Sequence, residues 1–104
     1  MHSGTLAQSN VTPPSAPTNV HITGSFGCPE FFVGWTQATD DTDPQSLIEY
    51  EIYVNGVLSP LAVSAGVDED FVYATASGAN TFTVKAVDQA GNTSEASNSF
   101  TEFC

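Results

Sequence analysis

Residues 48–56, IEYEIYVNG, contain the pattern that decides the fold. Apolar or aromatic side chains alternate at Tyr50, Ile52 and Val54, and a period of two is typical of a β-strand with one buried face. Asn55-Gly56 follows at once, and this dipeptide favours the positive φ angles that a type I′ hairpin turn requires. The stretch therefore predicts a strand, a tight turn and a second, antiparallel strand.

The same period of two continues on both sides of this hairpin, and no segment has the i, i+3, i+4 spacing of an amphipathic helix. Pro60 lacks a backbone N–H, so the strand after the turn is expected at a sheet edge. The other strands are expected around Val20 and Ile22, at Phe31, Val33 and Trp35, in 70–76, in 81–87 and in 97–103. Seven short strands at this spacing predict an all-β, immunoglobulin-like β-sandwich of antiparallel strands.

The length of 104 residues suits a single domain. Pro13, Pro14 and Pro17 favour an extended chain, so we expect a flexible leader or linker over 1–13 and a domain over 14–104. Twelve acidic residues face a single basic one, Lys85, for a net charge of −11. Phosphate backbones and anionic lipids attract Lys and Arg, so nucleic acids and membrane surfaces are excluded as partners.

Four stretches carry a resemblance to a known family: PSAPTNV (14–20), VGWTQATDD (33–41), IEYEIYVNG (48–56) and FTVKAVDQAGNTSEASN (82–98). In this order and spacing they resemble a fibronectin type III domain, most closely those of secreted bacterial polysaccharide-degrading enzymes and surface proteins. The resemblance implies sheets A-B-E and C-C′-F-G. It places Trp35 and Tyr50 in the core, to which the alternation of apolar side chains adds Ile52, Phe82 and Val84.

One position departs from that family. A tyrosine usually stands six residues before the position of Ala86 and locks a corner between the sheets, whereas this chain has Asn80 there. The geometry of that corner is therefore open at the level of sequence.

In the implied topology, the loops after the second, fourth and sixth strands lie at one pole of the sandwich. Clustered carboxylates can hold calcium, which takes six to eight oxygen ligands, and Asn92 lies near the last of these loops. Asp and Asn also favour turns because their side chains accept bonds from local backbone amides, and this interpretation is preferred, with no cofactor expected. The loops bring seven acids to this pole, Asp40, Asp41, Asp43, Asp68, Glu69, Asp70 and Asp88, of which all but Glu69 are the calcium candidates.

Cys28 and Cys104 form no CxxC pair, so zinc and thioredoxin-like chemistry have no support. Taken alone, they suit either a disulfide in a secreted protein or two free thiols in a cytosolic one. The implied topology brings both to the pole opposite the acids, which favours a disulfide and a secreted or cell-surface location. In the chain-entropy model such a bridge stabilises the fold by about 4 kcal/mol.

Catalytic residues have little support in the sequence. His2 lies in the leader, His21 is expected to point outward from the first strand, and no serine stands in a GxSxG context. The turn VDQAGN (87–92) lacks a second carboxyl across a substrate cleft, which glycosidase chemistry needs. We therefore expect a protein that is not an enzyme.

Phe32 is expected on the outer face of its strand, because Phe31 and Val33 point inward. Beside it, the fifth strand offers either Val72 or the pair Phe71 and Tyr73 to the same face. An exposed aromatic face could stack on a sugar or dock a neighbouring domain, although a single covered aromatic is the simpler interpretation.

The sequence predicts a monomeric, non-catalytic fibronectin type III module of a secreted or cell-surface, bacterial protein. Such a module acts as a spacer between the neighbouring domains of a larger parent protein. The alternative is a glycan- or protein-binding module that uses the acidic loops or the face around Phe32 and is stabilised by calcium.

Overall fold

The computed structural model describes residues 12–25 and 27–104 as a sandwich of two antiparallel sheets. Most of the leader expected over 1–13 thus lies outside the described residues. The first sheet has the order β1-β2-β5 and the second has the order β4-β3-β6-β7. These are the A-B-E and C-C′-F-G sheets that the resemblance implies. The strands are β1 (Thr18–Ser25), β2 (Glu30–Thr36), β3 (Glu49–Val54), β4 (Val57–Ala65), β5 (Glu69–Tyr73), β6 (Ala79–Val87) and β7 (Phe100–Phe103).

The predicted hairpin is confirmed between β3 and β4. Asn55 has a φ of 53° and Gly56 a φ of 84°, the two positive values that a type I′ turn needs. β4 lies at the edge of its sheet, as Pro60 predicts. A short 3₁₀ helix, η2 (Gln45–Leu47), precedes β3. Within the described part of the chain, no helix has the length and apolar character needed to cross a membrane.

The last strand is shorter than the expected 97–103, because serine side chains replace part of its backbone ladder. The amide of Val84 donates to Ser97 Oγ at 2.8 Å, and the amide of Ala86 donates to Ser94 Oγ at 2.9 Å. Asn98 then reaches the other sheet, where its Oδ1 accepts from the Val20 amide at 2.9 Å. The segment before β7 therefore ties β6 to the edge of β1 rather than forming a regular strand.

Alternate side chains of both sheets fill the space between them. Trp35, Tyr50, Ile52, Phe82 and Val84 are all buried. The rings of Trp35 and Tyr50 lie 5.2 Å apart between centroids, which places the large side chains of facing sheets in direct contact. This core holds the two sheets together and leaves the end loops and the outer faces of the sheets to carry any site.

Asn80 forms the corner that the sequence left open. Its side chain is fully buried and satisfied, which a buried amide requires. Oδ1 accepts from the amides of Thr75 and Ala76 at 3.2 and 3.0 Å, and from Asn55 Nδ2 at 3.0 Å. Nδ2 donates to the carbonyls of Ala76 and Gly78. The amide thus holds the β5–β6 connection and joins it to the hairpin turn.

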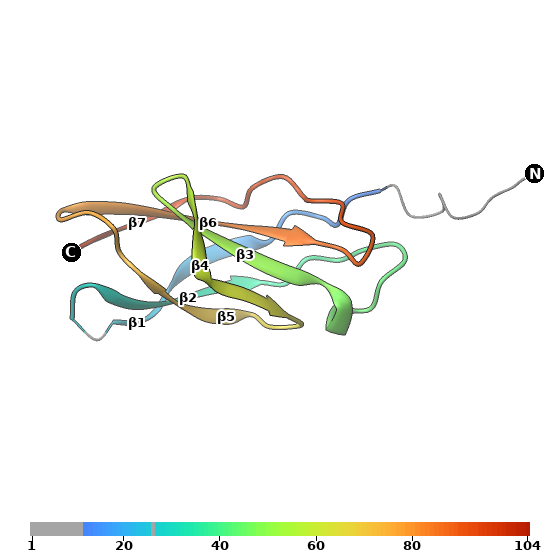
Figure 1. The fold of residues 1–104 in the computed structure, drawn as a ribbon, viewed down its shortest axis with the longest axis horizontal. Coiled ribbons are helices and arrows are strands. Elements are labelled where there is room, and N and C mark those ends of the chain that lie inside the picture. Colours follow the sequence, from blue (N-terminus) through green and yellow to red (C-terminus); the bar gives the residue numbers. More distant parts are fainter. Residues whose placement is uncertain (1–11, 26) are drawn as a thin grey trace, which may run out of the picture.

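The predicted disulfide between Cys28 and Cys104 is confirmed, with Cα atoms 5.4 Å apart. It joins the β1–β2 connection to the end of β7. Cys104 also exchanges backbone hydrogen bonds with Gly78 at 2.8 and 3.2 Å. The C-terminus is therefore attached both to the β1–β2 connection and to the β5–β6 connection. Figure 1 shows that the first described residues, drawn in blue, and the C-terminus lie at opposite ends of the sandwich.

Candidate functional site

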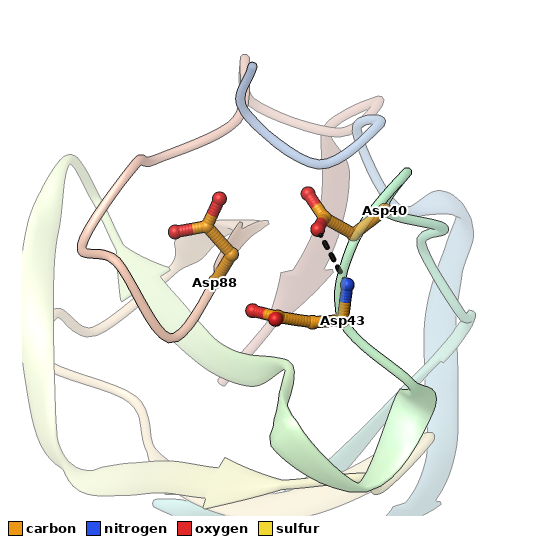
Figure 2. Close-up of side chains that lie close together, drawn as sticks. All are labelled: Asp40, Asp43 and Asp88. Atoms are coloured by element: carbon orange, nitrogen blue, oxygen red, sulfur yellow. Dashed lines mark hydrogen bonds between the residues drawn. The ribbon is translucent and has the colours of Figure 1, made fainter. Parts of the chain in front are cut away.

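Three aspartates meet at the pole opposite the disulfide. One carboxylate oxygen from each of Asp40, Asp43 and Asp88 can be chosen such that all three lie within 4.8 Å of one another. Asp40 and Asp43 come from the β2–β3 connection, and Asp88 comes from the turn that follows β6. Figure 2 shows the three carboxylates around a common centre, with Asp40 and Asp88 on either side. We call Asp40, Asp43 and Asp88 the aspartate triad.

The β2–β3 connection positions two members of the triad. Asp40 Oδ2 accepts from the backbone amides of Thr42 and Asp43 at 3.0 and 2.9 Å, which closes a tight turn (Figure 2). Asp43 Oδ2 accepts from the amide of Gln89 at 2.6 Å. That bond ties the β2–β3 connection to the turn after β6 across 46 residues of sequence.

Asp88 is the buried member of the triad, with 4% of its surface exposed. Its Oδ1 accepts from the Asn92 amide at 2.8 Å, and its Oδ2 accepts from Asn92 Nδ2 at 3.0 Å. Gly91 has a φ of 92°, a backbone conformation that residues with a Cβ atom rarely adopt. These contacts agree with the prediction that VDQAGN (87–92) forms a turn.

The other four acids of this pole lie outside the triad. Asp41 accepts from the hydroxyl of Thr42 at 3.1 Å, and Asp70 Oδ1 accepts from the Phe71 amide at 2.8 Å. Asp68 contributes its carbonyl oxygen to the Trp35 amide at 3.0 Å, and Glu69 pairs with Gly34 in the β2–β5 ladder. The topology thus gathers the loops at one pole, while local turn geometry decides which carboxylates converge.

One oxygen in the triad has no partner. Asp40 Oδ1 exposes less than 1 Å² to solvent and accepts no hydrogen bond. Lys85 is the single basic residue of the chain, and it does not neutralise the charge of the triad because it lies elsewhere on the sheet. Its Nζ lies 4.9 Å from the centroid of the Tyr53 ring, and Tyr53 pairs with Thr83, farther along β6 from Asp88. Lys85 thus makes a cation–π contact with Tyr53, and it lies opposite Glu51 in the register of β3 and β6.

The outer face of the β1-β2-β5 sheet carries the second candidate site. Of the two alternatives for β5, the structure places Val72 inside and Phe71 and Tyr73 outside. Phe32 and Phe71 are directly opposite in register, with centroids 5.4 Å apart and planes at 67°. Phe71 and Tyr73 lie 5.1 Å apart with planes at 77°. We call Phe32, Phe71 and Tyr73 the aromatic cluster.

The geometry of the aromatic cluster favours contact among its own rings. Edge-to-face pairs are a preferred arrangement of aromatic side chains and stabilise by about 0.5–1.5 kcal/mol each. Rings at such angles form no flat platform across the strands. Tyr73 is still 44% exposed, so one ring remains available to a ligand.

Comparison with solved structures identifies the fold. No protein-family model matches the sequence, and no curated protein matches it. The chain superposes on the central fibronectin-III array of RIM-binding protein with a TM-score of 0.64 and 18% identity, over 91% of this chain and 33% of that one. It superposes on the FN1–FN3 domains of chicken CNTN1 with a TM-score of 0.62 and 16% identity, over 88% of this chain and 34% of that one.

A bacterial enzyme contains a similar domain. The chain superposes on the spore cortex lytic enzyme SleM of Clostridium perfringens with a TM-score of 0.66 and 20% identity. That match covers 88% of this chain and 29% of SleM, so the chain spans about a third or less of the length of these three structures. The fold is that of a fibronectin type III domain, as the sequence motifs predict, and it occurs within larger multidomain chains.

Proposed function

We propose that the chain is a non-catalytic, monomeric fibronectin type III module that acts as a spacer in a secreted or cell-surface, bacterial protein. The observation that carries this proposal is the placement of the two ends. The chain enters at the pole of the aspartate triad and leaves at the disulfide, at the opposite end of the sandwich (Figure 1). A compact sandwich with this arrangement sets a fixed separation between the domains on either side.

The disulfide between Cys28 and Cys104 supports a secreted or cell-surface location. Structural disulfides persist in oxidising environments and are rare in the cytosol. The similarity to a domain of SleM, a bacterial lytic enzyme, supports a bacterial parent protein. The single basic residue supports a role without nucleic acids or anionic lipids as partners, since both recruit Lys and Arg.

A second candidate function is recognition of a polysaccharide or protein by the aromatic cluster. The exposed ring of Tyr73 is the observation in its favour. An aromatic side chain supplies contact area at a low cost in conformational entropy, which suits a binding face. The edge-to-face packing of the cluster is the observation against it, because the rings already contact one another and offer no flat surface to a ligand.

Calorimetric titration against soluble polysaccharides separates the two functions. A spacer shows no saturable binding, for the wild type or for Tyr73→Ala. Phe103→Ala is the matched control, because Phe103 is 72% exposed and lies on β7 of the other sheet. Saturable binding that Tyr73→Ala abolishes and Phe103→Ala retains would replace the spacer by a binding module. Turnover of any substrate in a hydrolase panel would refute the non-catalytic role.

A further inference from the structure

We propose that the aspartate triad binds a calcium ion that joins the β2–β3 connection to the turn after β6. This inference goes beyond the spacer role and is independent of it. Its ligands are Asp40, Asp43 and Asp88, whose carboxylate oxygens lie within 4.8 Å of one another (Figure 2). Four considerations support a cation at this position: an unsatisfied oxygen, the local charge, the remaining ligand capacity and the position of the site in the fold.

The unsatisfied oxygen supports a cation at the triad. Asp40 Oδ1 is shielded from solvent and accepts no hydrogen bond. Buried polar atoms are almost always paired, and an unpaired one calls for an ion or an ordered water. Thr42 and Asp43 donate their amides to the other oxygen, Oδ2, so the turn contacts leave Oδ1 unused. Figure 2 shows the Asp40 carboxylate facing the centre of the triad.

The local charge also favours a cation. Three carboxylates repel one another at this separation, and the repulsion increases as the surroundings exclude water. Asp88 is nearly fully buried, which removes much of the hydration that would otherwise screen it. The one basic side chain of the protein, Lys85, lies over Tyr53 instead. A bound divalent cation supplies the missing positive charge.

The oxygens left over suit calcium better than magnesium. Gln89 occupies Oδ2 of Asp43, so Oδ1 of Asp43 and Oδ1 of Asp40 can both ligate. Each Asp88 oxygen accepts from Asn92, which fixes the orientation of the third carboxylate of the triad. Calcium accepts irregular sets of six to eight oxygens completed by water, whereas magnesium requires near-ideal octahedral geometry. Carboxylates from two separate loops suit the irregular coordination of calcium, which is why we assign calcium and not magnesium.

The position of the site gives the ion a structural effect. The β2–β3 connection also holds the N-terminal segment, because the Ser15 amide donates to the Thr39 carbonyl and the Thr39 amide donates to Ser15 Oγ, both at 2.8 Å. Thr39 directly precedes Asp40. Calcium would thus stiffen the pole at which the chain enters the domain.

Thermal unfolding of the chelator-treated protein tests the proposal. Calcium at 2 mM is compared with magnesium at 2 mM and with sodium chloride at matched ionic strength. We expect calcium to raise the midpoint by at least about 5 °C over both, and chelator to reverse the rise, because a ligand that binds only the folded state stabilises it by mass action. Equal shifts with magnesium, or no shift beyond that of sodium chloride, would overturn the calcium assignment.

Two variants locate the site. Asp43→Asn removes one ligand charge from the triad and retains an oxygen that can accept from Gln89. Asp41→Asn makes the same charge change two residues away, outside the triad. We expect Asp43→Asn to lose the calcium response while its metal-free midpoint stays equal to or above that of the wild type, and Asp41→Asn to keep the full response. Loss of the response in both variants alike would refute the triad as the site.

Discussion

At the scale of single residues, Asn80 fixes the corner between β5 and β6, where the resembling family usually has a tyrosine. A buried side chain that fixes a corner must satisfy the backbone groups that the corner leaves unpaired. Asn80 does so with one carboxamide, whose oxygen accepts three hydrogen bonds and whose nitrogen donates two. A tyrosine hydroxyl has a single donor proton and would reach fewer of these groups.

Asn80→Ala tests this assignment. The substitution removes the acceptor of the Thr75 and Ala76 amides and empties a fully buried side-chain position, so we expect the free energy of unfolding to fall by about 2–4 kcal/mol. Ser77→Ala, in the same connection at an exposed position, is the control and should change stability by less than about 0.5 kcal/mol. Urea denaturation measures both, and equal effects of the two substitutions would contradict the role of Asn80.

At the scale of elements, a single hydroxyl connects β3 to the loop that precedes it. Tyr50 OH accepts from the Ala38 amide at 2.9 Å and donates to Gln45 Oε1, while Gln45 Nε2 donates to the Ala38 carbonyl at 2.8 Å. These bonds order the β2–β3 connection, which carries Asp40 and Asp43. Burial of Tyr50 raises the pKa of its hydroxyl above the ordinary value.

The raised pKa of Tyr50 predicts a loss of stability at high pH. The unfolded chain ionises Tyr50 near pH 10 while the folded chain keeps it neutral, so the stabilisation is complete below pH 10 and is lost as the pH rises towards the folded pKa. The slope from this group is at most about 1.4 kcal/mol per pH unit.

Tyr50→Phe should therefore show a shallower decline between pH 9 and 11 than the wild type. It should also be less stable at pH 7 by about 1–2 kcal/mol, because the Ala38 amide loses its acceptor. The exposed Tyr73→Phe serves as the control. Urea denaturation across this pH range is the measurement, and parallel curves for wild type and Tyr50→Phe would count against the assignment. Tyr53, whose pKa burial and Glu51 also raise, is present in every curve and cancels in the comparison.

At the scale of the whole molecule, the disulfide decides how the module responds to tension. Cys28 and Cys104 are 76 residues apart in sequence, and Cys104 lies where the chain leaves the sandwich. Force applied between the two ends passes from the first strand across the sulfur atoms to Cys104. The residues between the cysteines are thereby excluded from extension, which is a useful property in a spacer.

Single-molecule pulling on the two ends of the chain tests this consequence. The oxidised protein should extend only through the residues before Cys28, whereas reduction should add a step of about 250 Å, from roughly 3.3–3.6 Å per released residue. The double variant Cys28→Ser/Cys104→Ser should give the long step without reductant. A long step in the oxidised wild type would show that the bridge does not carry the force.

The family resemblance implied the two sheets and left the buried face of β5 open, whereas the sequence by itself determined the hairpin turn and the buried faces of β2, β3 and β6. These follow from local rules: alternation at Tyr50, Ile52 and Val54 selects a half-buried strand, and Asn55-Gly56 selects the turn. Strand direction, once the fold is known, also placed Cys28 and Cys104 at one pole. The start of the last strand was misplaced because the hydroxyls of Ser94 and Ser97 imitate a backbone ladder, which no periodicity records.

Only the tertiary structure decided which acidic side chains converge. Asp40, Asp41 and Asp43 look alike in sequence, yet Asp41 turns to Thr42 while Asp40 and Asp43 face Asp88. The local turn orients Asp40, whereas Asp43 is held by the Gln89 amide of a loop 46 residues away in sequence. The same holds for Asn80, whose five bonds join three segments. A strand can be predicted locally because its side chains alternate between the two faces of a sheet whichever strand it pairs with. A site depends on distances between segments that are far apart in sequence and come together only on folding.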